Sequence, residues 1–383
     1  MKKRYKVLIG IWIGIILLNL LAWCSAPFCD WYVTYVFPIW VHTYGRLSGV
    51  FPFSVGEWML YLAVVYMLVN LILCIPAWIF RKRESTKGLR RFLSAVPWFV
   101  TLVCIVMTLN CTILYHCTPM KKLLLQEVAD AEEDDSTDSL ERLIALREEV
   151  VANCNRLAGQ MQRDENGYIV AGSHKELSDR AIRAMQGISE QFPRLSGYYP
   201  DPKPLMASWF FSQQYMCGYY FPFSMEANYN DMMYVMNIPY TLCHELSHLK
   251  GYIYEDEANF LAYLACLQSG DQVFEYSGYL GVLYYVENDL HKALESSGQP
   301  DYYEQLTPID AQVHTDNCFL TPEAWSKVED TSFLDTEFVA QVSDEFVETT
   351  LTLNGVEDGM ISYSRVVELL LLYKEIQSTQ HAG

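Results

Sequence analysis

Basic residues are scarce over most of this chain of 383 residues. Residues 1–91 carry eleven Lys and Arg against three Asp and Glu, and residues 92–117 carry no Asp, Glu, Lys or Arg. Because the formal net charge of the whole chain is −19, residues 118–383 carry −27. Phosphate groups repel an acidic segment of this size, which excludes a nucleic-acid partner and disfavours lying flat on anionic lipid.

A disulfide framework is also missing. Six of the eleven cysteines lie in or beside the N-terminal apolar runs, and the other five, an odd number, are scattered over residues 118–383. A small domain stapled by disulfides would show an even number at close spacing. We therefore expect most of these cysteines to be buried thiols.

Three apolar runs, in contrast, are long enough to cross about 30 Å of hydrocarbon. They cover residues 7–24, 58–80 and 96–115, and none contains a charged side chain or a histidine. The absence of charge argues against a transporter. The first run is long and lacks a convincing cleavage site, so we expect an uncleaved anchor and not a signal peptide. Polar residues within the runs, Asn19, Asn70 and Asn110, are expected to form interhelical hydrogen bonds.

Lys and Arg are concentrated in two short segments beside these runs. These are the N-terminal MKKRYK and residues 81–91, RKRESTKGLRR, which we expect to be a loop. The positive-inside rule keeps both segments in the cytoplasm, and the chain after the third span then lies outside it. The sequence thus predicts a multi-pass protein of the cell membrane. Residues 1–117 form a domain in the lipid bilayer, and residues 118–383 form an extracytoplasmic domain.

The outer domain contains the sequence His244-Glu245-x-x-His248. On an α-helix, four residues turn through about 400° and rise roughly 6 Å, so both imidazoles reach one ion from the same face. Catalytic zinc sites use three protein ligands and leave one position open. Glu245 adjoins a ligand, where it can take a proton from a zinc-bound water as general base and then donate it as general acid.

A third ligand is expected from a second helix shortly afterwards. Gly251 suits a left-handed C-cap that ends the first helix, and Glu255 and the residues after it open the next one. Glu255 is the expected third ligand, and Asn259 on the same face can form a hydrogen bond with a ligand histidine. Glu257 is the alternative ligand, and the spacing leaves the choice between the two glutamates open.

The motif H-E-x-x-H followed by E-x-x-A-N resembles the gluzincin peptidases, in which a glutamate of the second motif is the third zinc ligand. Three wider segments, GYYFPFSMEANYN, CHELSHLKG and EDEANFLAYLAC, resemble a family of uncharacterised multi-pass bacterial membrane proteins with a zincin-like domain. The resemblance covers about residues 195–270, which would be the metal core. It implies a Zn²⁺ cofactor and a metallopeptidase scaffold, and it indicates no substrate.

Residues near the metal motif supply further candidates. Residues 217–224 are the best strand candidate. Glu226, Asn228 and Asn230 either line a substrate groove beside this strand or satisfy the backbone of their own turns. A zinc peptidase also uses a side chain that stabilises the oxyanion. Four residues are candidates, and we choose none of them: His291, His314, Tyr363 and Arg365.

The sequence therefore predicts an α+β, mostly helical fold with three transmembrane helices followed by a zincin-like metallopeptidase domain. The predicted function is that of a membrane-anchored zinc metallopeptidase, which hydrolyses a peptide or protein substrate outside the cytoplasm. His244, His248 and Glu255 would hold the metal, and Glu245 would be the catalytic base. The alternative is a non-hydrolytic zinc-binding envelope protein that binds a peptide or protein partner.

Overall fold

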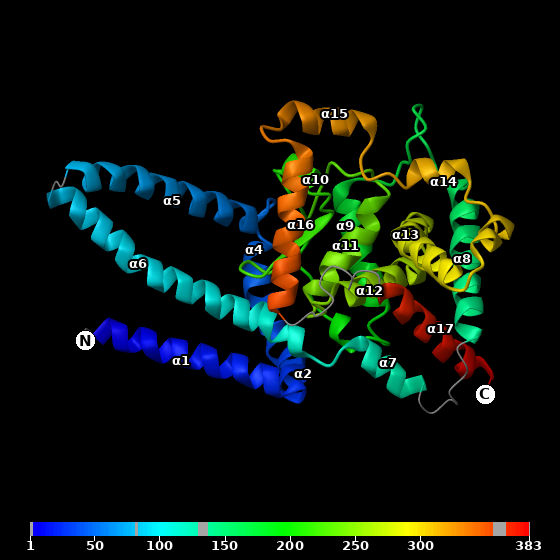
Figure 1. Cartoon of the computed structure of the whole chain (residues 1–383), viewed down its shortest axis with the longest axis horizontal. Coiled ribbons are helices and arrows are strands. Elements are labelled where there is room, and N and C mark those ends of the chain that lie inside the picture. Colours follow the sequence, from blue (N-terminus) through cyan, green and yellow to red (C-terminus); the bar gives the residue numbers. More distant parts are fainter. Residues whose placement is uncertain (1–2, 81–82, 129–136, 355–364, 383) are drawn as a thin grey trace. The chain divides into compact units, whose positions relative to one another are not determined.

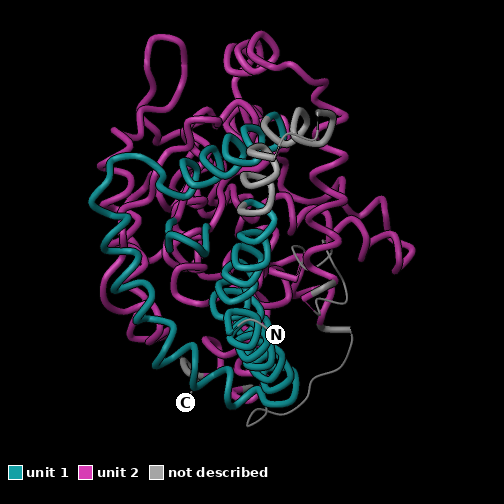
Figure 2. The backbone as a smooth tube through the Cα atoms, turned by 90° about the vertical axis from the view of Figure 1, so that its left-hand side faces the viewer, with its two compact units in different colours: residues 1–117, 221–226 teal, residues 118–220, 227–383 magenta. Residues whose placement is uncertain are grey.

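The computed structural model describes residues 3–80, 83–128, 137–354 and 365–382, with helices and strands labelled as in Figure 1. The chain divides into two compact units, which Figure 2 distinguishes by colour. Unit 1 comprises Met1–Cys117 and Phe221–Glu226, and unit 2 comprises Thr118–Tyr220 and Ala227–Gly383. No pattern in the sequence indicates that Phe221–Glu226 is grouped with the N-terminal part.

Unit 1 contains the apolar helices. Three of its stretches are long and apolar enough to cross a membrane, and they are Lys3–Cys24, Val55–Ile72 and a segment that begins at Phe92. The helices are α1 (Lys3–Cys24), α2 (Ala26–Tyr35), α3 (Phe37–Trp40), α4 (Arg46–Ser48), α5 (Val55–Phe80) and α6 (Arg83–Met107), with π-helical turns at Val41–Gly45 and Thr108–Thr112 and a 3-10 turn at Leu114–His116.

The prediction of a loop at residues 81–91 is wrong for most of this segment. Helix α6 begins at Arg83, so most of this basic segment is helical. Its Arg, Glu, Lys and Leu residues are good helix formers. Their helical propensity extends the third apolar helix towards its N-terminus. As a result, α6 begins only three residues after the last residue of α5.

Polar side chains hold parts of unit 1 together. Asn19 Nδ2 donates to Thr108 Oγ1 at 2.9 Å, which joins α1 to the π-helical turn after α6. Asn110 Nδ2 donates to the carbonyl oxygen of Pro222 at 2.8 Å. Asn70 donates to a carbonyl of its own helix. The predicted interhelical hydrogen bond is therefore confirmed for Asn19 and wrong for Asn70.

Unit 2 is mostly helical and includes one small sheet. The strands are β1 (Lys203–Pro204), β2 (Gly218–Phe221) and β3 (Glu226–Tyr229), in the order β1-β3-β2. β1 runs parallel to β3, with Lys203 opposite Asn228. The strand expected at residues 217–224 corresponds to β2, which covers four of these residues. The described residues are mostly helical with few strands, which confirms this part of the predicted fold class.

The helices of unit 2 surround a common core. α11, α12 and α13 pack on one another, α8 packs on α13, and α9 packs on α11 and α12, as Figure 1 shows. Ala258, Ala262 and Ala265 of α12 have no exposed surface, and their small side chains let α11 approach closely. The helices are α7 (Met120–Val128), α8 (Thr137–Ala158), α9 (His174–Gly187), α10 (Ser208–Gln213), α11 (Asn237–His248), α12 (Glu255–Gln268), α13 (Gln272–Ser296), α14 (Ala311–Asp316), α15 (Pro322–Thr331), α16 (Thr336–Leu353) and α17 (Val366–Ala382), with 3-10 turns at Pro193–Leu195 and Pro300–Gln305.

A buried ion pair fastens α14 to the segment that follows α8. The side chain of Asp316 is completely buried. Arg163 donates to both of its oxygens, at 2.8 and 2.7 Å, and the hydroxyl of Tyr276 donates at 2.9 Å. Arg163 also donates to the carbonyls of Ala158 and Gly167, but Asp316 is its counter-ion, so this network is a sensitive point of unit 2.

We predict that Asp316→Ala destabilises the protein. The substitution removes the counter-ion of Arg163 and the acceptor of the buried Tyr276 hydroxyl, at a cost of about 3 kcal/mol. In a thermal unfolding experiment on the full-length protein in detergent, the midpoint should fall by roughly 6 °C or more. Asp301→Ala, at an exposed aspartate, is the control and should leave the midpoint nearly unchanged. Equal midpoints for both variants would contradict the assignment.

Candidate metal centre

The two histidines of the motif lie one turn apart at the C-terminal end of α11. Their ring centroids are 4.7 Å apart, and their Nε2 atoms are 3.1 Å apart. His248 is buried and His244 is slightly exposed. Helical spacing of four residues therefore places both imidazoles on one face, as the sequence predicts.

The turn after α11 both ends the helix and supports one histidine. Gly251 has a φ of 84°, the left-handed conformation that the sequence predicts for it. Its amide donates to the carbonyl of His248 at 3.0 Å, and the amide of Tyr252 donates to the carbonyl of Ser247 at 3.2 Å. The reversed chain places the carbonyl oxygen of Tyr252 2.7 Å from His248 Nδ1.

Helix α12 begins with the expected third ligand. Glu255 Oε2 lies 3.0 Å from His244 Nε2 and 3.7 Å from His248 Nε2. One turn later, Asn259 Oδ1 accepts a hydrogen bond from His244 Nδ1 at 2.8 Å, which confirms the supporting role predicted for Asn259. Glu257 points elsewhere, since its Oε1 accepts a hydrogen bond from the amide of Met120 at 2.6 Å. The structure therefore brings Glu255, and not Glu257, together with the histidines.

The three converging atoms have the spacing that zinc requires. In a tetrahedral site with bonds of roughly 2.1 Å, neighbouring ligand atoms are about 3.3 Å apart. The three distances between the ligand atoms of His244, His248 and Glu255 are 3.0, 3.1 and 3.7 Å. Two imidazole nitrogens and one carboxylate oxygen also form a donor set that zinc accepts.

The hydrogen bonds behind the histidines leave both Nε2 atoms facing the centre. The carbonyl of Tyr252 can only accept, so His248 Nδ1 carries a proton, and its Nε2 faces His244 and Glu255. Burial lowers the pKa of His248, but Glu255 outweighs it and raises this pKa to about 9, so Nε2 holds a proton unless a metal ion takes its place. His244 is held in the same way by Asn259. Two lone pairs and the Glu255 carboxylate repel one another at these distances unless a positive charge lies among them. These residues fit a divalent cation, which they would coordinate directly.

Glu245 lies beside the ligands and is not one of the three converging groups. Its side chain is buried, and burial raises its pKa to about 7, although His244 and His248 act in the opposite direction. Within the part of the chain that the structure describes, Glu245 Oε2 has no hydrogen-bond partner. A buried carboxylate oxygen in this state calls for a water or a cation. This is the position expected of a general base.

Two residues near the cluster belong to no motif. Gly218 of β2 approaches Glu245 so closely that an added Cβ would lie 2.7 Å from the carboxyl carbon. Burial, together with Cys217 and Glu255, raises the pKa of Tyr285 of α13 to about 12. A glycine inside a strand is a known signal of close approach, so Gly218 could have been found. Nothing in the sequence marks Tyr285.

The residues expected to line a substrate groove have other partners. The carboxylate of Glu226 accepts hydrogen bonds from the amides of Val55 and Gly56, at 3.1 and 2.7 Å. Asn230 Nδ2 donates to Ser212 Oγ at 2.9 Å, and its Oδ1 accepts from a neighbouring amide of its own turn. Asn228 donates to a carbonyl of β2. The groove role is therefore wrong for Glu226, and the turn role is confirmed for Asn230.

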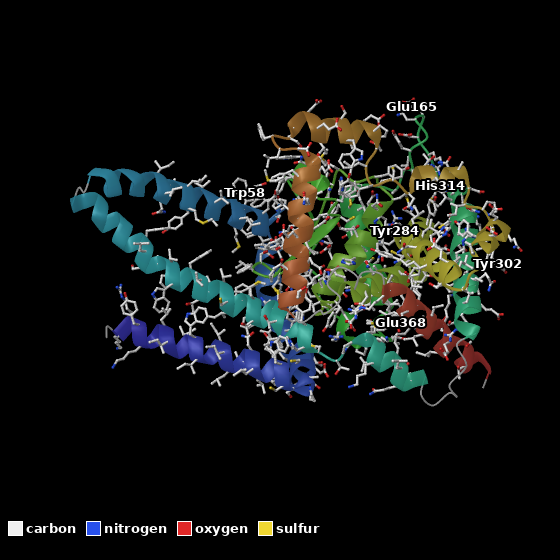
Figure 3. All side chains as sticks on the ribbon, in the orientation of Figure 1. Trp58, Glu165, Tyr284, Tyr302, His314 and Glu368 are labelled. Carbon is white, nitrogen blue, oxygen red and sulfur yellow. The ribbon has the colours of Figure 1, made fainter. Side chains whose placement is uncertain are left out.

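Of the four candidates for oxyanion stabilisation, the three that the structure describes have other surroundings than the converging ligands. The His291 ring stacks on another ring in unit 2, and Arg365 lies 3.6 Å from a carboxylate oxygen of Asp256. Figure 3 shows His314 on α14, whereas the ligands come from α11 and α12. Tyr363 lies outside the described residues. Tyr285 of α13 was not among these candidates, and Glu255 is one of the groups that raise its pKa, after burial.

Two glutamates on α12 offer a matched test of the ligand assignment. Glu255→Gln replaces a converging carboxylate, whereas Glu257→Gln changes a carboxylate whose partner is the amide of Met120. Elemental analysis of the purified full-length protein should find zinc with the wild type and with Glu257→Gln. We expect the Glu255→Gln variant to bind zinc at least tenfold more weakly, about the loss caused even by supporting residues.

The reverse pattern, with zinc retained by Glu255→Gln and lost from Glu257→Gln, would make Glu257 the ligand. Zinc retained equally by both variants would contradict a site in which a glutamate of α12 coordinates the ion.

Comparison with known proteins identifies one family. A family model described as "Protein of unknown function (DUF3810)" matches residues 32–371. No curated protein matches the chain, and no solved structure matches it either.

Proposed function

The chain belongs to the DUF3810 family, whose function is unknown, and from its own cluster of residues we propose a membrane-anchored zinc-dependent metallopeptidase of the zincin kind. The observation that carries the proposal is the convergence of His244, His248 and Glu255 at distances of 3.0 to 3.7 Å, with Glu245 beside them. A catalytic zinc site has three protein ligands and one open position, which this set of residues matches.

The chain's own residues would divide the chemistry among them. Zinc held by the three ligands supplies a Lewis acid that polarises water and the scissile carbonyl. Glu245 takes a proton from the attacking water and later gives it to the leaving amine. Its buried position supports this role, because the pKa of about 7 lies near neutral pH, where a base works best. The Tyr285 hydroxyl keeps its proton and can donate to a developing oxyanion.

Glu245→Gln should abolish turnover and leave the metal in place. The glutamine has the same size, but it cannot accept a proton, so cleavage should fall by about 10²- to 10⁴-fold. The measurement combines elemental analysis with cleavage of a broad peptide library by the full-length protein, read by mass spectrometry of the new termini. Cleavage at the wild-type rate by this variant would rule out the mechanism.

A non-hydrolytic protein that binds a peptide or protein partner is the second candidate. The burial of the proposed base, of which only 4% is exposed, is the observation that opposes turnover, whereas His244 and Glu255 keep 13% and 18% of their side chains exposed. In the same peptide library, stoichiometric zinc without any cleavage by the wild type would support binding and oppose hydrolysis.

The distribution of charge supports an extracytoplasmic position for unit 2. The basic segments at the N-terminus and at residues 81–91 flank uncharged helices, and residues 118–383 carry −27. Basic segments stay in the cytoplasm, so three crossings place unit 2 and its site on the opposite side of the membrane. The bilayer would thus hold the site near the cell surface, where a peptide or protein substrate reaches it.

Enzyme fusions test this orientation. Alkaline phosphatase needs disulfides and is active only outside the cytoplasm. We expect an active phosphatase when it follows Gly383 and an inactive one when it follows Thr86, within the basic segment. Fluorescent-protein fusions at the same two positions are the matched control and should give the opposite result. Phosphatase activity at Thr86 alone would invert the orientation.

A further inference from the structure

The turn between β2 and β3 is bound to the N-terminal helices of unit 1. Asn110 Nδ2 donates to the carbonyl of Pro222, and the Phe221 ring packs on Gly56 so closely that an added Cβ would overlap the ring. Met225 has a φ of 54° and no exposed surface. A buried, non-glycine residue in this strained region persists only where its surroundings fix it. The turn is therefore firmly held.

Glu226 is the main link in this arrangement. Its carboxylate accepts hydrogen bonds from the amides of Val55 and Gly56 and, at 2.5 Å, from Ser224 Oγ. The amides of the first turn of a helix have no partner within the helix, and a carboxylate there also interacts favourably with the helix dipole. Since only 1% of Glu226 is exposed, water cannot easily replace it.

The other end of β2 lies against the proposed general base. β2 runs from Gly218, which touches the Glu245 side chain, to Phe221, which touches Gly56. Three residues of a strand extend about 10 Å, so a shift of the turn is passed along the strand with little room for compensation. Tyr220, between the two ends, has its ring centroid 6.2 Å from that of His248.

We propose that Glu226 is a positioning residue, which fixes β2 through the turn and so holds Gly218 against the Glu245 carboxylate. Glu226 touches neither a ligand nor a reacting atom, and its effect passes through the covalent continuity of the strand. The inference rests on the proposed function, because positioning Glu245 matters only if Glu245 acts as a base. It makes the first turn of α5 a point from which the site can be regulated.

Hydrogen exchange tests the structural half of this proposal without any turnover. In the full-length protein in lipid nanodiscs, Glu226→Ala should raise amide exchange at least tenfold both at residues 54–57 and in β2, at residues 218–221. Glu57→Gln is the matched control. It removes a buried carboxylate from the same turn of α5, which accepts a hydrogen bond from Tyr61 of α5 at 2.5 Å, so β2 exchange should rise far less than in Glu226→Ala. Faster exchange at residues 54–57 with β2 unchanged in Glu226→Ala would overturn the proposal.

Kinetics test the catalytic half. Glu226→Ala should lower kcat at least tenfold while KM stays within twofold and zinc remains stoichiometric. Gly218→Ala should reproduce this loss with the α5 turn intact, because the added Cβ displaces Glu245. Glu226→Gln should recover part of kcat, since its amide oxygen still accepts a hydrogen bond. A fall in zinc content and kcat together would indicate a general loss of structure and would overturn the positioning role.

The two readouts separate the possible failures. If Glu226→Ala does not fold, Glu226→Gln takes its place, with a smaller rise in β2 exchange expected and an unchanged β2 counting against the proposal. If the wild type cleaves no peptide, the proposed peptidase function fails, whereas the exchange data still decide whether Glu226 holds β2.

Discussion

Three electron-pair donors converge inside unit 2, and the rest of the site depends on this convergence. The ligand atoms of His244, His248 and Glu255 lie 3.0 to 3.7 Å apart, and their lone pairs repel one another unless a cation separates them. Both rings are held from behind, by Asn259 and by the carbonyl of Tyr252. The fold therefore holds the three donor groups in place, which would reduce the entropy lost if an ion binds. The packing of the helical core, and not a flexible loop, compensates for the entropy lost when these side chains are ordered.

The ligand set could be predicted because it is local in sequence. Residues 244–259 contain the three ligands and both supporting groups, so helical periodicity and one glycine turn nearly determine their positions. The choice between Glu255 and Glu257 could not be made in this way, since it depends on the rotation of α12. The amide of Met120, 137 positions earlier, donates a hydrogen bond to the Glu257 carboxylate and so holds that side chain away from the histidines.

Features that depend on distant contacts were not predictable. Glu226 was expected in a substrate groove, but the amides that it binds lie 171 and 170 positions earlier. Tyr285 comes near the cluster only because α13 packs on α11 and α12. The mostly helical class and the three apolar helices followed from composition alone, whereas the helical start of α6 at Arg83 was hidden by a basic segment that suits a loop equally well.

The proposed base and the proposed metal ligands are therefore held in position by different elements of the fold. The ligands are fixed by two adjacent helices, but Glu245 is bounded by Gly218 of a strand only four residues long. Strands this short, in a sheet of three, are barely stable by their own pairing. β3 gains support from its parallel pairing with β1, and the turn before it gains support from Glu226. Under the proposed function, metal binding depends on α11 and α12, whereas the position of Glu245 depends on the turn that Glu226 holds. Binding and chemistry can thus be lost separately in this fold.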